Sequence, residues 1–237
     1  MTTTNAAAGA PPRRVLAIDS TTGACSAAVT VDGRLAGRWR REGAQGHAEV
    51  LMPGIAEAMA AAGAGFADLD LLAVTVGPGS FTGLRVGLAA VRGLALALGV
   101  PVVGVSTFEA VAAGASDVAA RSRCILVDSR RGDVFLQCFG PAGHLSGPLA
   151  EPVVAAPESV PDLLPPGPLW IGGDGVAVLR AAGIDPAARG DAVLSDAGPD
   201  AVAVAAVGVA RHLGMLPPLP MRPLYIRPPA AKLPAAR

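Results

Sequence analysis

The sequence predicts an α/β protein of two similar lobes, each a mixed sheet flanked by helices. Two observations carry this prediction: a strand motif near the N-terminus returns in the middle of the chain, and apolar strands alternate with helices through the first half. The chain has 237 residues, of which 51% are hydrophobic and 16% are charged, so it can bury one large core or two small ones.

The repeated motif is an apolar strand that ends in Asp-Ser-x-x-Gly. Its copies occupy residues 15–23 and 124–132. Each copy is followed by a second strand, at 24–31 and 133–140, and then by a small turn and a further extended piece. A mixed sheet with helices that occurs twice indicates α/β architecture of the ribonuclease-H/actin type. Coincidence in a chain rich in Ala, Gly and Val is the alternative.

The remaining elements follow from apolar periodicity and turn residues. In the first half we expect a strand at 35–40, a helix at 47–62, a strand at 71–76, a helix at 81–98 and a strand at 102–105. In the second half we expect a strand at 169–171 and helices at 176–182 and 200–213. The Pro-rich passage 148–168 is expected to resist regular structure.

Changes in composition predict the domain boundaries. Residues 1–14 are expected to be a loose tail, because they lack the charge-then-apolar order of a signal peptide. The first lobe is expected at 15–106, completed by the helix at 200–213, and the second at 107–199. Residues 214–237 are rich in proline and are expected to be extended and outside the core.

Charge and cysteine content exclude several classes of protein. The 19 basic and 19 acidic residues cancel, so the chain is a poor nucleic-acid binder by itself, and a partner is expected to hold any RNA. The three cysteines are scattered without a CxxC pair, which favours a reducing, cytoplasmic location over a disulfide or zinc scaffold. The apolar helix within 84–98 carries Arg85 and Arg92 and is expected to be too short to span a membrane.

A glycine-rich turn, Gly77-Pro78-Gly79-Ser80-Phe81-Thr82-Gly83, leads from a strand into the helix at 81–98. That helix is polar only at Thr82, Arg85 and Arg92, and a helix that is apolar nearly all round is covered on two sides. We therefore expect it to form a partner interface with the helix at 47–62. The alternative is that both helices are sandwiched inside one domain. The candidate interface residues are His47, Leu51, Ile55, Met59, Phe81, Thr82, Leu84, Arg85, Leu88, Val91 and Arg92.

Four segments, at 18–21, 45–53, 77–85 and 127–131, together resemble the TsaB (YeaZ) family. The resemblance runs from Val15 to about Arg227 and weakens in the Pro-rich middle. It implies two actin-like (ASKHA) lobes and a non-catalytic role in bacterial synthesis of tRNA N6-threonylcarbamoyladenosine. The implied partners are a catalytic paralogue, TsaD, and a small ATPase, TsaE, with a homodimer when the chain is alone and tRNA bound only through the complex.

The residues themselves offer no catalytic or metal site. The catalytic paralogues bind a metal with two histidines at i and i+4 on a helix, whereas here His47 is followed four residues later by Leu51. A metal-dependent peptidase is therefore disfavoured, and no cofactor is expected.

A vestigial nucleotide or ligand pocket remains a possible interpretation. Its candidate residues are Asp19, Ser20, Thr21, Gly77, Gly79, Ser80 and Asp128. The loop after Asp19 lacks the glycine expected two places on, and the loop after Asp128 carries Arg130 and Arg131 where phosphate would need space. A structural turn is favoured, with a nucleotide at a partner interface left open. The competing function is a small actin-like kinase or ATPase that uses Asp19 and Asp128 around a metal–nucleotide.

Overall fold

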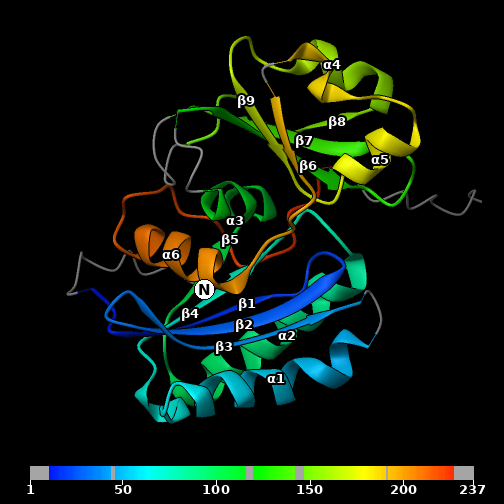
Figure 1. Cartoon of the computed structure of the whole chain (residues 1–237). Coiled ribbons are helices and arrows are strands. Elements are labelled where there is room, and N and C mark those ends of the chain that lie inside the picture. Colours follow the sequence, from blue (N-terminus) through cyan, green and yellow to red (C-terminus); the bar gives the residue numbers. More distant parts are fainter. Residues whose placement is uncertain (1–10, 44–45, 116–119, 142–146, 191, 227–237) are drawn as a thin grey trace, which may run out of the picture.

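The computed structural model describes residues 11–43, 46–115, 120–141, 147–190 and 192–226. Within them the chain forms two lobes, each built on one five-stranded sheet (Figure 1). The two sheets have the same topology. In each, the first strand pairs antiparallel with the second and parallel with a later one, as the repeated motif predicts.

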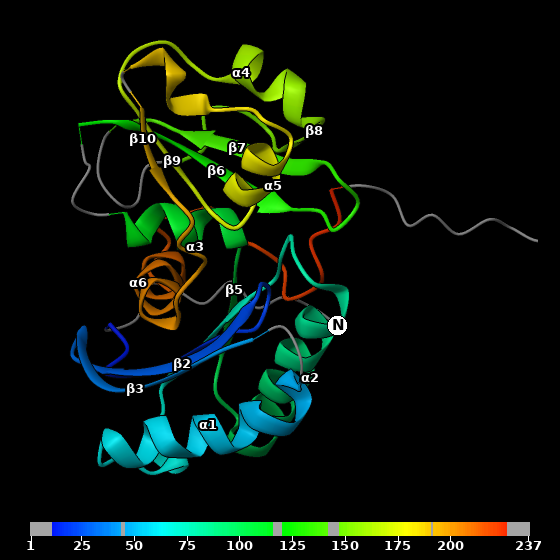
Figure 2. The ribbon, with the colours of Figure 1, turned by 45° about the vertical axis from the view of Figure 1, so that its right-hand side comes forward.

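The first sheet has the order β3-β2-β1-β4-β5. Its strands are β1 (Arg14–Asp19), β2 (Ala24–Val31), β3 (Arg34–Glu42), β4 (Leu71–Thr75) and β5 (Val102–Val105). Helices α1 (His47–Ala61) and α2 (Phe81–Leu98) cover one face, while α6 (Ala201–His212) and α3 (Thr107–Gly114) lie on the face toward the second lobe (Figure 2). A 3-10 turn, η1 (Phe66–Asp68), precedes β4.

The second sheet has the order β10-β9-β6-β7-β8. Its strands are β6 (Ser122–Asp128), β7 (Val134–Phe139), β8 (Val153–Ala155), β9 (Leu169–Gly172) and β10 (Ala192–Ser195). Its short helices are η3 (Pro157–Ser159), α4 (Val160–Leu163), α5 (Val176–Ala181) and η4 (Pro186–Arg189). The prediction of an irregular passage at 148–168 is therefore wrong, because β8, η3 and α4 lie within it.

Alternation along β1 divides the first core into two layers. Leu16 and Ile18 pack toward α1 and α2, while Val15 and Ala17 pack toward α6. On the α1 side the backbone approaches closely: a Cβ on Gly54 of α1 would lie 2.3 Å from the ring of Trp39 on β3. Burial of both faces explains why β1 is continuously apolar.

Two elements that the sequence analysis did not anticipate connect the lobes. Helix α3 packs against α6 and β6, and its N-terminus has a capping box in which Ser106 and Glu109 exchange side-chain and backbone hydrogen bonds. The β10 strand leads into α6, whose N-cap Asp200 binds Arg38 at 2.7 Å and Arg40 at 3.3 Å. The Ser-x-x-Glu signal for α3 was present in the sequence.

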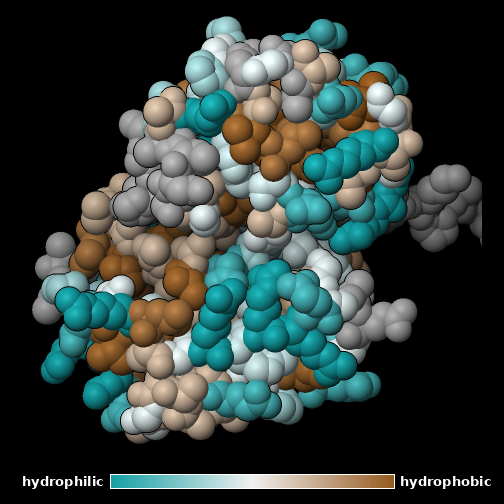
Figure 3. Space-filling model, viewed as in Figure 1, coloured by the Kyte–Doolittle hydropathy of each residue, from teal (hydrophilic) through white to brown (hydrophobic). Residues whose placement is uncertain are grey.

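Strand β3 is an edge strand with four arginines, two of which hold Asp200. Hydrophilic side chains gather on this front of the lower lobe, where β2 and β3 lie (Figure 3). Charged side chains on an edge strand oppose unwanted pairing with other chains.

Helix α2 has the length and composition to cross a membrane, so the expectation that it is too short is wrong. Helices in the cores of folded proteins can have the same length and apolar composition. Here Leu84, Leu88 and Val91 are at most 2% exposed and pack inside the first lobe.

The segment after α6 packs against both lobes, so the expectation that it lies outside the core is wrong for residues up to 226. Leu219, Met221 and Leu224 contact the α1–α2 side of the first core, and Ile226 contacts the second lobe. The Leu224 N–H donates to the Val76 carbonyl at 2.7 Å. We call residues 214–226 the C-terminal strap.

Truncation tests the strap. Removing residues 215–237 should lower the free energy of unfolding by about 3 kcal/mol or more, because several apolar side chains lose their burial. A chain that ends at Ile226 keeps every contact named here and should unfold like the full chain. Urea unfolding followed by circular dichroism measures both; equal midpoints for the two truncations would contradict the assigned role.

Candidate functional site

Asp19, at the carboxyl end of β1, is the most perturbed acid in the first lobe. Its side chain is fully buried, and its Oδ1 accepts hydrogen bonds from the Thr75 hydroxyl at 2.6 Å and from the Thr21 hydroxyl at 2.7 Å. Its Oδ2 has no hydrogen-bond partner among the described residues. Burial raises the pKa of Asp19 from 3.8 to about 6, an effect that these hydrogen bonds only partly offset.

The glycine-rich turn lies directly on the loop after β1. Ser80 N–H donates to the Thr21 carbonyl at 2.6 Å, and the Ser20 hydroxyl donates to the Gly83 carbonyl at 2.8 Å. A Cβ on Gly79 would lie 2.1 Å from the Thr21 oxygen, and one on Gly83 would lie 1.9 Å from the Ser20 oxygen. Glycine is thus required because two backbones touch.

Six of the seven candidate ligand residues therefore lie close together, and they pack against one another. Asp19, Ser20, Thr21 and Gly77 are buried, while Gly79 and Ser80 are half-buried. The Thr107 hydroxyl, at the start of α3, joins this network by donating to the Pro78 carbonyl at 2.6 Å. The peptide bond between Gly77 and Pro78 is cis.

Asp128, the seventh candidate, ends β6 in the second lobe, and its side chain is engaged there by Arg130. The Arg130 guanidinium contacts Asp128 at 3.1 Å and Asp174 at 3.0 Å. The backbone N–H of Arg130 also donates to Asp128 at 2.7 Å, with Arg130 in a left-handed conformation (φ 63°). One arginine thus contacts two carboxylates. The pairing of Arg130 with Asp174 was missed by sequence reasoning.

Most of the candidate interface side chains point into the first lobe, contrary to expectation. The helices at 47–61 and 81–98 do lie in one layer, but the following seven residues are 7% exposed or less: His47, Leu51, Ile55, Met59, Leu84, Leu88 and Val91. The remaining four candidates, Phe81, Thr82, Arg85 and Arg92, are exposed.

The outer face of these two helices carries large apolar side chains among small ones. Leu96 is 90% exposed, Phe81 54% and Met52 44%. Phe81 lies beside Tyr225 of the strap, with ring centroids 6.5 Å apart, and the Arg85 guanidinium lies 3.7 Å from the Phe81 ring centroid. This exposed face (Met52 of α1; Phe81, Arg85, Arg92 and Leu96 of α2) replaces the predicted residue set as the candidate docking face.

The two helices that carry the candidate docking face expose side chains of opposite charge. Helix α1 exposes Glu49 and Glu57, while α2 exposes Arg85 and Arg92 and contains no acidic residue. A second chain with the same helix pair could therefore place acidic positions against basic ones.

The described residues contain no group of three or more His, Cys, Asp and Glu side chains that could hold a metal ion. The Nε2 atom of His47, the first residue of α1, lies 3.1 Å from the Gly43 carbonyl. This contact supports a structural role for the histidine.

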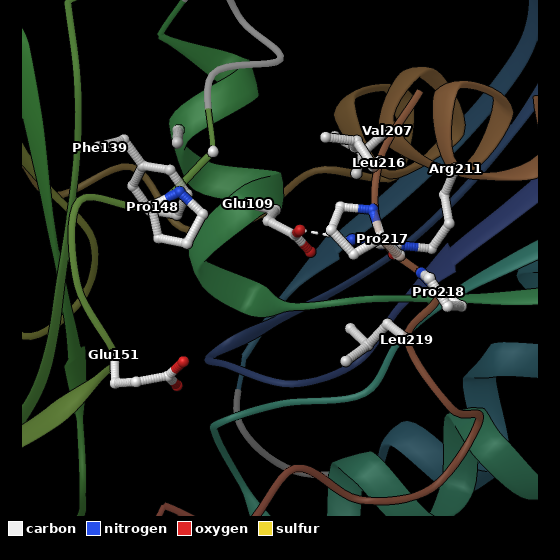
Figure 4. Close-up of a pocket in the computed structure, with 12 residues that line it drawn as sticks. Glu109, Phe139, Pro148, Glu151, Val207, Arg211, Leu216, Pro217, Pro218 and Leu219 are labelled. Atoms are coloured by element: carbon white, nitrogen blue, oxygen red, sulfur yellow. Dashed lines mark hydrogen bonds and ion pairs between the residues drawn. The ribbon is translucent and has the colours of Figure 1, made fainter. Parts of the chain in front are cut away.

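A pocket of about 310 Å³ lies between the lobes, under the strap (Figure 4). Its walls are mostly apolar, and its two central polar groups are already paired: Glu109 with Arg211, and Arg211 also with the Gly104 carbonyl at 2.6 Å. This pocket is therefore best understood as part of the joint between the lobes.

The doubled sheet, with an aspartate at the end of the first strand of each copy, defines a two-lobed protein of the actin-like class. The sequence model of the family described as TsaD, tRNA N6-adenosine threonylcarbamoyltransferase, matches residues 41–172. Solved YeaZ from Pseudomonas aeruginosa superposes with a TM-score of 0.76 at 27% identity and covers 90% of this chain and 99% of that one.

Among sequence relatives, an uncharacterized protein of Mycobacterium tuberculosis (strain ATCC 25618 / H37Rv) is 32% identical over 92% of this chain and 93% of its own length. The tRNA threonylcarbamoyladenosine biosynthesis protein TsaB of Escherichia coli (strain K12) is 36% identical over 52% of this chain. That alignment spans about half of the E. coli protein, 53% of its length. The chain belongs to the TsaB (YeaZ) family.

The raised pKa of Asp19 predicts a pH dependence of stability. The folded state holds this proton more tightly than the unfolded chain, so the contribution of Asp19 to stability is greatest below pH 3.8 and is lost as the pH rises to about 6. A difference of about two pKa units, at about 1.4 kcal/mol each, amounts to about 3 kcal/mol. Asp19→Asn should lack this contribution.

Urea unfolding of the parent and of Asp19→Asn across the interval from pH 4 to pH 7 measures the difference. Glu57→Gln is the control, because Glu57 is an exposed carboxylate of the same lobe. Parallel pH profiles for the parent and Asp19→Asn would contradict the assignment.

Proposed function

We propose that this protein is a partner subunit in the synthesis of tRNA N6-threonylcarbamoyladenosine at position 37. In this proposal it dimerises with a TsaD-like catalytic paralogue and recruits a TsaE-like ATPase, and it is not an enzyme by itself. Family membership supports the pathway, because two relatives carry the name tRNA threonylcarbamoyladenosine biosynthesis protein TsaB.

The observation that carries the non-catalytic role is the contact between the loop after β1 and the glycine-rich turn. Actin-like ATPases use the first of these loops to hold phosphate, whereas here its backbone touches Gly79 and Gly83. In the second lobe the Arg130 guanidinium already sits between two carboxylates. Both features favour a scaffold that needs no cofactor of its own, with any nucleotide placed at the partner interface.

The docking face is the proposed contact with the catalytic paralogue, and with a second copy when the chain is alone. Exposed Leu96 and Met52 supply apolar area, and the acidic and basic helices supply complementary charge. A partner of the same fold suits this face, because it would present a similar helix pair. The proposal includes tRNA binding only through the complex and a cytoplasmic location without membrane attachment.

Leu96→Glu tests the docking face. The side chain is 90% exposed, so the variant should fold like the parent but lose self-association and paralogue binding, because a carboxylate would be buried in an apolar contact. Leu149→Glu is the matched control, since Leu149 is 56% exposed in the second lobe. Size-exclusion chromatography with circular dichroism gives both readouts; a folded Leu96→Glu that still associates would exclude this face.

A small actin-like kinase or ATPase is the alternative, favoured by the position of Asp19 at the end of β1. The proposal predicts that the purified chain neither hydrolyses ATP nor modifies tRNA unless the paralogue and the ATPase are added. Phosphate release and tRNA nucleoside analysis measure the two activities. Turnover by the chain alone that Asp19→Asn abolishes would establish the alternative.

A further inference from the structure

We propose that Cys124 and Cys138 form a reversible disulfide site in the sheet of the second lobe. The two residues do not form a CxxC motif, but the register of β6 and β7 places them directly opposite each other. Both are thiols in the structure.

The hydrogen-bond pattern of this strand pair decides how closely the two side chains approach. The Ser129 N–H donates to the Asp133 carbonyl at 3.2 Å, one step beyond the pair Asp128 and Val134. Hydrogen-bonded and non-hydrogen-bonded pairs alternate along an antiparallel ladder. Ser129 and Asp133 form a hydrogen-bonded pair. Alternation back along the ladder therefore makes Cys124 and Cys138 a non-hydrogen-bonded pair.

A second hydrogen bond supports this count independently. The Cys138 carbonyl accepts from the Leu149 N–H at 2.8 Å, on the side of β7 that faces away from β6. The N–H and C=O of one strand residue point to the same side, so those of Cys138 point away from Cys124.

Non-hydrogen-bonded pairs bring Cα atoms to about 4.5 Å, and disulfides need about 4.4–6.8 Å. Directly opposite residues also project to the same face of a sheet. Here that face packs on α5, where Cys124 and Cys138 lie in one apolar cluster with Leu126 and Leu136. Backbone geometry thus permits the bond without moving the strands.

The two thiols differ in access. Cys138 is half-buried, whereas Cys124 is fully buried. Hydrogen peroxide would first convert the Cys138 thiol to a sulfenic acid and release water. The Cys124 thiol would then attack that sulfur, forming the disulfide and releasing a second water. The two thiols together lose two protons and two electrons, and a dithiol reductant returns them.

Cys25 provides an internal control. It is buried in β2 of the first lobe, away from the other two cysteines in the fold, and burial raises its pKa to about 12. An unreactive third thiol is therefore expected.

The test is oxidation of the full chain with hydrogen peroxide. The count of titratable thiols in denaturant should fall from three to one. Peptide mapping should find Cys124 joined to Cys138, and dithiothreitol should restore all three thiols. The oxidised chain should melt about 5 °C higher, because the bond constrains the unfolded state.

Cys138→Ser should abolish both the cross-link and the shift in melting temperature, whereas Cys25→Ser should leave both unchanged. Each of three results would overturn the proposal: three thiols that persist, a sulfinic or sulfonic acid at Cys138 without a cross-link, or a bond between two chains. The experiment needs no partner protein, so its result does not depend on the proposed function.

Discussion

The direct contact between two backbone loops is the constraint on which the rest of this structure depends. The loop after β1 and the glycine-rich turn after β4 meet with no room for a side chain at Gly79 or Gly83. This contact sets where α2 begins and so directs its buried face onto the first sheet. It also buries Asp19, whose hydrogen bonds to Thr75 and Thr21 link β1 to β4. One close approach therefore positions the helix and fills the space between the two loops with backbone.

Residues that come from late in the chain complete the first lobe and reach the second. Asp200 caps α6 and is held by two arginines of β3, while Arg211, at the other end of α6, binds the Gly104 and Pro217 carbonyls. The strap then carries apolar side chains from one core to the other. Because these contacts span the chain, the first lobe is complete only when α6 and the strap have folded onto it.

The second lobe repeats the topology of the first, but the two lobes differ in the groups that surround the aspartate at the end of the first strand. Asp19 is buried beside hydroxyl groups, whereas Asp128 pairs with Arg130. The same strand-end aspartate thus has a raised pKa in one lobe and an arginine partner in the other.

The sequence by itself determined the element order, the repeat and the glycine-rich turn, because apolar periodicity and turn residues act locally. The bounds of α2 and β5 agree with those predicted, and most other ends differ by one or two residues. The short elements α3 and β10 were missed, since so few residues give little periodicity, and the further extended piece expected in the second copy was given no bounds. Only the tertiary structure decided which side of α2 is buried. That helix is apolar nearly all round, so its own pattern does not distinguish Leu88, inside, from Leu96, outside. Strand register likewise decided the pairing of Cys124 with Cys138, because contacts across a sheet depend on the alignment of two strands and not on local sequence.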